Sequence, residues 1–249
     1  MMKKIAILLA GFALFSVNLV AEEVYATFVS YGVKEASLKL NASGIVDTIN
    51  VDVGSKVKKG DVLLKIKNNT QIESVKMQQA QADADEQTYL FQKSQYERYE
   101  QSKSVIDKNT FEQIYSTFKS AENQYKTSLA SLQLQKETLN NTYLKAPFSG
   151  TIATKSIELG EGVTQNSTEL FTLISDEIKL VLEFDSKYMG KVKVGDIYNF
   201  SVDNAKNKQS ATITKVYPSI DSQTRKVKAE AKVQNMVSGV FGDGFITTK

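Results

Sequence analysis

Three features of this 249-residue sequence predict an α+β protein of elongated, multidomain architecture. Residues 61–146 contain no glycine and no proline, which predicts a long helical element. The segments on either side of that stretch repeat one another, which predicts two halves of one small β domain. From Glu177 onward, short runs alternate apolar and polar residues, which predicts a further small β-barrel.

The first 21 residues have the pattern of an export signal. Lys3 and Lys4 precede an apolar run over residues 5–15, and we expect cleavage after Ala21. The alternative is an uncleaved anchor, because residues 5–21 are at the lower limit of the length that spans a bilayer. No later segment is apolar for long enough to cross a membrane, so we expect an exported protein.

The composition excludes several functions. The chain has no cysteine and no histidine, which removes disulfides, thiol chemistry, the commonest metal ligand and the commonest acid–base catalyst. Its formal net charge is only +3, without a basic block, so nucleic-acid binding is not expected. We predict a protein with no catalytic residue, no cofactor and no bound metal.

Residues 22–40 are predicted to form short strands that lead into the β domains. Residues 41–69 follow as the first half of the split β domain. Their apolar residues alternate with polar ones between the turn glycines Gly44, Gly54 and Gly60. This half is too short to close a core alone.

The second half, residues 142–176, repeats the first half. At a constant separation of 106 residues, Gly44, Val46, Val51, Gly54 and Val57 are matched by Gly150, Ile152, Ile157, Gly160 and Val163. Because glycines and apolar positions agree together, we expect the two halves to pack face to face, each supplying strands that the other lacks.

Residues 70–141 are predicted to form an antiparallel two-helix hairpin. Apolar side chains recur at every seventh position on both arms, a spacing that gives a left-handed coiled coil. They are Val75, Ala82, Tyr89 and Tyr96 on the first arm and Phe111, Phe118, Tyr125, Leu132 and Leu139 on the second. Gln79 and Glu86 also fall in this seam, so we expect a slender, flexible and largely solvated element.

The turn between the two arms is expected within residues 101–110, where the seven-residue repeat breaks. Two interpretations remain open there. Asp107 is a candidate N-cap of the second arm. Val105 and Ile106 are expected to be exposed apolar residues with no core to enter, which favours a contact with another protein.

Residues 177–249 are predicted to form the β-barrel. Alternating runs begin at Ile178, Tyr198 and Val227, and the segment around Gly242 and Gly244 closes the domain.

The order of these pieces resembles the periplasmic adaptor subunits, or membrane fusion proteins, of Gram-negative tripartite efflux pumps. The resemblance is carried by residues 43–46 with 54–61, residues 146–152 with 160–163, and residues 220–227. It implies that the split repeat is a lipoyl-like domain, that the hairpin reaches an outer-membrane channel, and that the last domain is a barrel. The chain stops about where the barrel stops, so we expect the family's membrane-proximal domain to be absent or rudimentary.

The resemblance also implies channel contacts at the hairpin tip. Arg98 and Tyr99 match the family's pattern, whereas Ser102 stands where the family has leucine and Asp107 stands where it has serine. The candidate contact residues are therefore Arg98, Tyr99, Val105, Ile106, Asp107 and Lys108.

A second candidate motif lies in the barrel. Asp221, Thr224 and Arg225 either face a transporter or stabilise a loop through aspartate hydrogen bonds and a salt link to Arg225. The loop interpretation is preferred.

The function implied by the resemblance is that of a non-enzymatic adaptor in the periplasm, peripheral to the inner membrane. It would link an inner-membrane transporter to a TolC-like outer-membrane channel and so export drugs or other small molecules. An RND-type transporter is favoured, with an ABC-type exporter as the alternative. A homo-oligomeric ring, taken to be a hexamer, would form through a heterologous interface.

Two other classes of function compete with the adaptor. A biotin or lipoyl carrier shares the half-motif repeat, and Val75, Lys76 and Met77 mimic the surroundings of a biotin acceptor, but Lys76 falls on the predicted helix instead of a turn between the halves. A hydrolase would use the acids of the barrel, although these mostly stand beside turn residues, where aspartate is a turn former. They are Asp185, Asp196, Asp203 and Asp221.

Overall fold

The computed structural model describes residues 22–202 and 209–248. The predicted export signal and the candidate acid Asp203 lie outside these residues. The chain divides into two compact units, one containing the residues up to Gly32 and from Glu177 onward, the other Val33–Asp176. No helix in the described ranges is long and apolar enough to cross a membrane.

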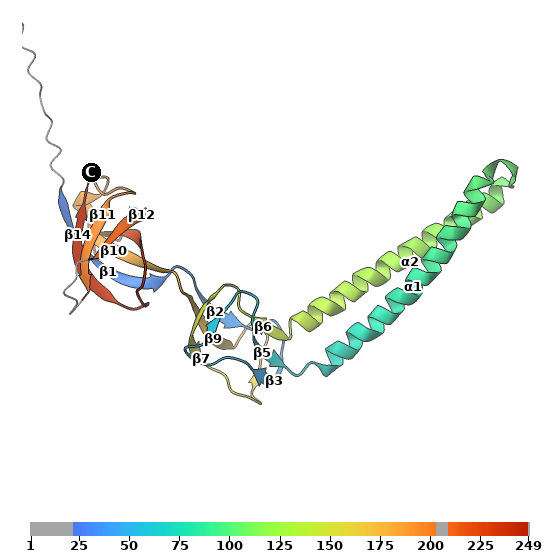
Figure 1. The fold of residues 1–249 in the computed structure, drawn as a ribbon, viewed down its shortest axis with the longest axis horizontal. Coiled ribbons are helices and arrows are strands. Elements are labelled where there is room, and N and C mark those ends of the chain that lie inside the picture. Colours follow the sequence, from blue (N-terminus) through green and yellow to red (C-terminus); the bar gives the residue numbers. More distant parts are fainter. Residues whose placement is uncertain (1–21, 203–208, 249) are drawn as a thin grey trace, which may run out of the picture. The chain divides into compact units, whose positions relative to one another are not determined.

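The first unit is a closed antiparallel barrel, as predicted (Figure 1). Its strands follow one another around the barrel in the order β1, β10, β13, β12, β11 and β14, and β14 pairs with β1 again. Thus β1, from the start of the chain, completes a barrel whose other strands all come from the end. The strands are β1 (Glu23–Gly32), β10 (Ile178–Asp185), β11 (Ile197–Val202), β12 (Gln209–Ile220), β13 (Lys226–Val233) and β14 (Phe241–Thr247).

Aromatic side chains fill the barrel because β14 presents glycines to the interior. The ring centroids of Phe28 and Phe200 are 4.9 Å apart, and the buried Tyr198 hydroxyl donates a hydrogen bond to the Ala26 carbonyl at 2.8 Å. A methyl group on Gly244 would lie 2.6 Å from the Phe200 Cα, so only glycine lets β14 approach β11 this closely. The aromatic rings occupy the space that larger side chains on β14 would fill.

The second unit holds two four-stranded sheets around one core. One sheet has the order β2, β9, β7, β4 and the other β6, β5, β3, β8. The strands are β2 (Glu35–Lys39), β3 (Gly44–Ile49), β4 (Lys56–Val57), β5 (Val62–Ile66), β6 (Tyr143–Lys145), β7 (Gly150–Lys155), β8 (Gly162–Val163) and β9 (Glu169–Ser175). Each sheet therefore combines strands from before and after the helical insertion.

The repeat found in the sequence is also a repeat of hydrogen bonds. The Gly54 amide donates to the Ile152 carbonyl at 2.8 Å, and the equivalent Gly160 amide donates to the Val46 carbonyl at 3.0 Å. These two equivalent glycines are thus bonded to the equivalent strands β7 and β3 of the opposite halves. The expectation that the halves supply one another with strands is confirmed.

The bonds run in the opposite direction with the same reciprocity. The Val46 amide donates to Glu161 at 2.8 Å, and the equivalent Ile152 amide donates to Ser55 at 3.0 Å. Because each half leaves these backbone groups to be satisfied by the other, the half-motifs are expected to fold only together.

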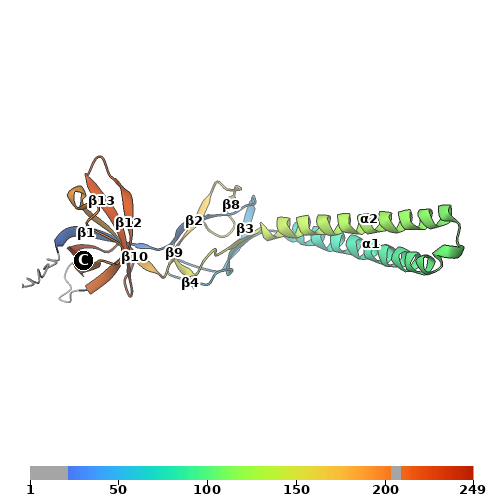
Figure 2. The same cartoon turned by 90° about the horizontal axis from the view of Figure 1, so that it is seen from above.

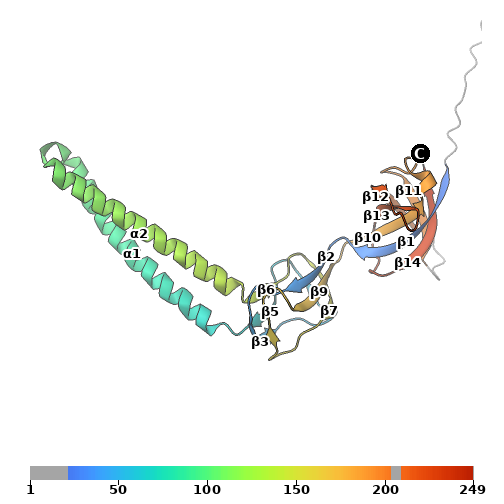
Figure 3. The same cartoon turned by 180° about the vertical axis from the view of Figure 1, so that it is seen from behind.

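Two helices of 33 residues each form the insertion. They are α1 (Asn69–Gln101) and α2 (Lys108–Asn140), joined through a short 3₁₀ turn, η1 (Lys103–Val105). They lie side by side in every view (Figures 2 and 3). At 1.5 Å per residue each helix is about 50 Å long. The predicted hairpin and its turn are therefore confirmed.

Candidate functional site

The distal half of the hairpin is held by an aromatic ladder along the predicted seam. Tyr89 stacks on Tyr125 with ring centroids 5.7 Å apart and on Phe118 at 6.0 Å, and Phe118 stacks on Tyr96 at 5.0 Å. Flat rings have few rotatable bonds and pack at low entropic cost. The ladder therefore holds the two helices together along the far half of the hairpin.

The middle of the seam is polar. Asp85 accepts hydrogen bonds from the buried Ser128 hydroxyl and from Gln81, and these bonds hold the pKa of the Asp85 carboxyl below its usual range. Beside it, the Tyr125 hydroxyl donates to Glu86 at 2.9 Å. A satisfied polar layer in an otherwise apolar seam fixes the register of the two helices.

The hairpin tip presents one apolar side chain to solvent. Val105 is 84% exposed, whereas Ile106 is partly buried. The expectation of two exposed apolar residues is therefore wrong for Ile106, because the chain leaves the 3₁₀ turn in an extended conformation there. Asp107 is the N-cap of α2 and accepts the Thr110 amide at 3.0 Å, which confirms the capping interpretation.

The other predicted tip residues lie near this turn but make only local contacts. Arg98, in the last turn of α1, donates to the Ser94 hydroxyl at 2.7 Å. The exposed Lys108 begins α2 and lies 3.6 Å from Glu112. Tyr99 is partly buried. These side chains are accessible to a partner but form no enclosed site.

The root of the hairpin is a buried polar clamp that the sequence analysis did not identify. The Asn68 amide, at the start of α1, donates to the Thr142 hydroxyl, beyond the end of α2, at 2.9 Å, and both residues are 2% exposed. The neighbouring residue Asn141 accepts a separate hydrogen bond from the exposed Asn41 side chain of the β domain at 3.4 Å. The sequence feature that could have indicated this clamp is the matching Asn-Asn-Thr triplet at residues 68–70 and 140–142.

The five turn glycines of the β domain have two different physical roles. Gly54, Gly60 and Gly160 have φ between 84° and 94°, which favours glycine in tight turns. Gly44 and Gly150 have ordinary backbone angles but lie close to neighbouring atoms, the Ile66 side chain at Gly44 and the Ile174 backbone at Gly150. All five positions are structural in this geometry.

The barrel motif forms a capped turn between β12 and β13. The Asp221 carboxylate accepts the backbone amides of Gln223 and Thr224, both at 2.9 Å, and these bonds hold its pKa below the usual range. The described residues contain no ion pair between Asp221 and Arg225, so the predicted salt link is wrong. The Asp221 carboxylate is bonded to backbone amides instead of to the Arg225 guanidinium, because Arg225 closes the turn with its backbone at φ of 57°.

The remaining candidate acids of the barrel are also caps. Asp185 accepts the Lys187 amide at 2.9 Å, and Asp196 accepts the Lys193 amide at 2.8 Å. The described part of the chain contains no cluster of three or more acidic side chains that could hold a metal ion. These positions fit turn formation and not hydrolysis.

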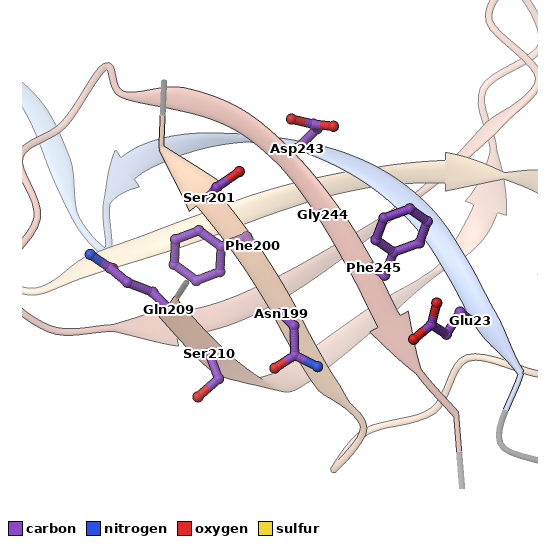
Figure 4. A pocket seen from close by; sticks show the side chains of 9 residues that line it. All are labelled: Glu23, Asn199, Phe200, Ser201, Gln209, Ser210, Asp243, Gly244 and Phe245. Atoms are coloured by element: carbon purple, nitrogen blue, oxygen red, sulfur yellow. The ribbon is translucent and has the colours of Figure 1, made fainter. Parts of the chain in front are cut away.

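A groove of about 490 Å³ lies on the outside of the barrel (Figure 4). Its acidic side chains are Glu23 and Asp243, which pair in register with Thr247 and Thr27 respectively. The two acids are thus four residues apart along the ladder, about 13 Å. That separation is too great for paired acid–base chemistry on one small bond.

Lys76, the carrier candidate, lies on the surface of α1. Its ammonium group is 2.8 Å from Glu73, one helical turn away, and its side chain is 67% exposed. A carrier lysine instead needs a tight turn between the two half-motifs, which the hairpin occupies here.

The comparisons with known proteins agree with this architecture. The model of the CzcB-like barrel-sandwich hybrid domain matches residues 34–176, more than half of the chain. The chain therefore belongs to this family, and its resemblance to the membrane fusion, or periplasmic adaptor, proteins is confirmed.

Two curated relatives show the range of the family. The cobalt-zinc-cadmium resistance protein CzcB of Cupriavidus metallidurans is 29% identical over 209 residues, which are 81% of this chain and 39% of CzcB. Multidrug resistance protein MdtA of Pectobacterium atrosepticum is 22% identical over 231 residues, 86% of this chain and 54% of MdtA. The chain thus spans between two fifths and about half of these relatives. Neither is named as an enzyme.

Among solved structures, the membrane fusion protein Spr0693 of Streptococcus pneumoniae R6 has the same fold. The TM-score is 0.70 at 15% identity, with 91% of this chain and 99% of that chain covered. At this identity the likeness shows the fold alone.

Proposed function

We propose that this chain is a periplasmic adaptor that links an inner-membrane efflux transporter to an outer-membrane channel. The observation that carries the proposal is that the hairpin contributes no residue to either hydrophobic core. Neither core needs this pair of 33-residue helices, so we infer that the hairpin contacts a partner outside the chain. The aromatic ladder in the distal half of the hairpin and the buried clamp at the hairpin root suit an arm that must reach a distant partner.

The hairpin tip is the proposed contact with a TolC-like channel. Val105 is its exposed apolar residue, with Arg98, Tyr99 and Lys108 around it. Asp107 and the half-buried Ile106 shape the turn. An apolar side chain that protrudes at the end of a solvated arm supports a protein contact.

The barrel is the proposed partner of the transporter. CzcB and MdtA are named for resistance to cations and to drugs, which supports an RND-type partner and export of small solutes, without deciding which. Neighbouring copies of the chain would close a ring, which we take to be a hexamer, through a heterologous interface. This ring would be peripheral to the inner membrane on its periplasmic side.

Excision of residues 71–140 tests the proposal in cells that lack the native chain. Both cores are retained, so the shortened protein should fold, be exported and accumulate, yet restore no efflux. The replacement Leu134→Asp is a matched control, since that side chain is 64% exposed and lies far from the tip. Restored efflux by the shortened protein would overturn the proposed function.

A further inference from the structure

One end of the barrel combines exposed cations with protruding aliphatic side chains. It is built from the connection 186–196, between β10 and β11, and the turn 221–225, between β12 and β13. These segments meet where Asp185 pairs with Lys226 and the Ser186 amide donates to the Arg225 carbonyl at 3.2 Å. We call these two segments together the basic end.

The apolar side chains of the basic end are held outward by the fold. Met189 is 40% exposed and Val194 is 65% exposed. Between them Val192 is buried in the barrel core at 3% exposure and anchors the loop. Gly190 and Gly195, with φ of 84° and 96°, form the turns that direct the two tips away from the core.

The two segments of the basic end carry four cations against two acids, so their formal charge is +2. Asp185 and Asp196 cap amides of their own loop. Lys187 and Lys193 are exposed, and within the described ranges neither has a carboxylate at ion-pair distance. The exposed Arg225 adds a third cation from the neighbouring turn.

This pattern favours a lipid surface over a protein surface. Lysine is depleted at protein interfaces, whereas here lysines flank the exposed aliphatic tips. The one aromatic ring of the basic end, Tyr188, is partly buried beneath Lys187 and Lys191 at 4.9 and 5.7 Å. Aliphatic tips flanked by lysines instead suit the interface of an anionic bilayer, where the tips enter the headgroup layer and the lysines meet phosphates.

We propose that the basic end of the barrel lies on an anionic phospholipid surface. Met189 and Val194 enter the headgroup layer. Lys187, Lys193 and Arg225 face the lipid phosphates.

The connection to the start of the chain supports the same placement. The Lys191 ammonium lies 2.8 Å from Glu22, the residue that directly follows the apolar segment 5–21 in the sequence. The basic end therefore lies beside the residue at which the described chain begins, so a membrane that holds the apolar segment would be close to this end. The inference depends on the proposed function only for the identity of the membrane. Vesicle binding can therefore fail without contradicting the adaptor function.

Vesicle flotation tests the proposal with a chain that begins at Glu22. Both hydrophobic cores consist of residues from Val24 onward, so this chain contains the whole described fold, without the membrane affinity of the leader. It should float with vesicles that contain phosphatidylglycerol and not with pure phosphatidylcholine vesicles. At about 1 kcal/mol per surface lysine, Lys187→Gln with Lys193→Gln should weaken binding roughly 25-fold.

A matched double variant removes the same charge elsewhere. Lys76 and Lys93 of the hairpin are 67% and 45% exposed, and changing both to glutamine should leave vesicle binding unchanged. Equal losses from the two double variants, or no flotation of the unaltered chain, would overturn the proposal. So would loss of efflux in cells carrying the basic-end variant while its vesicle binding is unchanged, because that result assigns the end to a protein partner.

A single fluorophore tests the orientation, since the chain has no cysteine of its own. Val194→Cys and Val237→Cys, each labelled with a polarity-sensitive dye, compare the basic end with the loop at the other end of β13, where Val237 is 71% exposed. On anionic vesicles the emission should shift to the blue at position 194 and stay constant at 237. The reverse pattern, or equal shifts, would contradict the proposed orientation.

Discussion

Gly44 and Gly150 form a matched pair for mutation, because they occupy equivalent places in the two halves of the β domain but face different neighbours. A methyl group on Gly150 would overlap the backbone oxygen of Ile174 and lie 2.9 Å from its carbonyl carbon. A methyl group on Gly44 would lie 2.8 Å from Cδ1 of Ile66, the far end of a side chain that can rotate. Neither glycine has a positive φ, so the difference is one of space alone.

Gly150→Ala should destabilise the β domain by about 3 kcal/mol, the upper part of the range for overpacking, because β9 can retreat only by breaking its ladder with β7. Gly44→Ala should cost less than about 1 kcal/mol, since a new rotamer of Ile66 makes room and the alanine restricts the unfolded chain. For a chain of this size, the larger loss corresponds to a fall in melting temperature of about 6–12 °C.

Urea unfolding followed through the backbone amide NMR signals of β7 and β9 measures these losses in the β domain separately from the hairpin and the barrel. Equal losses at the two glycines, or a larger loss at Gly44, would refute the reasoning that contact with backbone, and not with a side chain, decides the cost.

Three further predictions concern the hairpin. Hydrogen bonds from two flanking lysines lower the pKa of Glu122 from 4.5 to about 2. The contribution of this carboxylate to stability is therefore present above pH 4.5 and is lost as the pH falls toward 2. Glu122→Gln should abolish that part of the acid sensitivity in circular dichroism melts. Asp107→Ala removes the N-cap of α2 and should cost about 1 kcal/mol in urea unfolding of the helices, with Asp107→Asn nearly neutral. Asn68→Ala leaves the buried Thr142 hydroxyl without its donor, so hydrogen exchange at the hairpin root should accelerate by roughly fivefold or more, as expected for a loss of about 1–3 kcal/mol.

The features of the fold that repeat could be predicted from the sequence. The separation of 106 residues between equivalent glycines anticipated the reciprocal bonds of Gly54 and Gly160, because both halves carry the same backbone demands. The seven-residue spacing of Tyr89, Tyr96 and their partners anticipated the seam, because a fixed period places side chains on one helical face.

The features that depend on tertiary partners could not be predicted. The sequence analysis expected no strand at β12. Only two of its residues, Ala211 and Ile213, are buried, and most of the others are exposed, so the alternating pattern is weak. The burial of Ile106 and of the Asn68–Thr142 clamp depends on neighbours that only the folded chain supplies. The basic end likewise arises because two connections distant in the sequence meet at one end of the barrel.

Photo-crosslinking from the hairpin tip tests the proposed adaptor function most directly. A p-benzoylphenylalanine placed at Val105, which is 84% exposed, should give a covalent adduct with the outer-membrane channel when cells are irradiated. The same residue at Leu134, 64% exposed and far from the tip, should give none with that channel. Absence of the channel adduct at Val105, or equal adducts at both positions, would contradict the proposal that the hairpin tip contacts the outer-membrane channel.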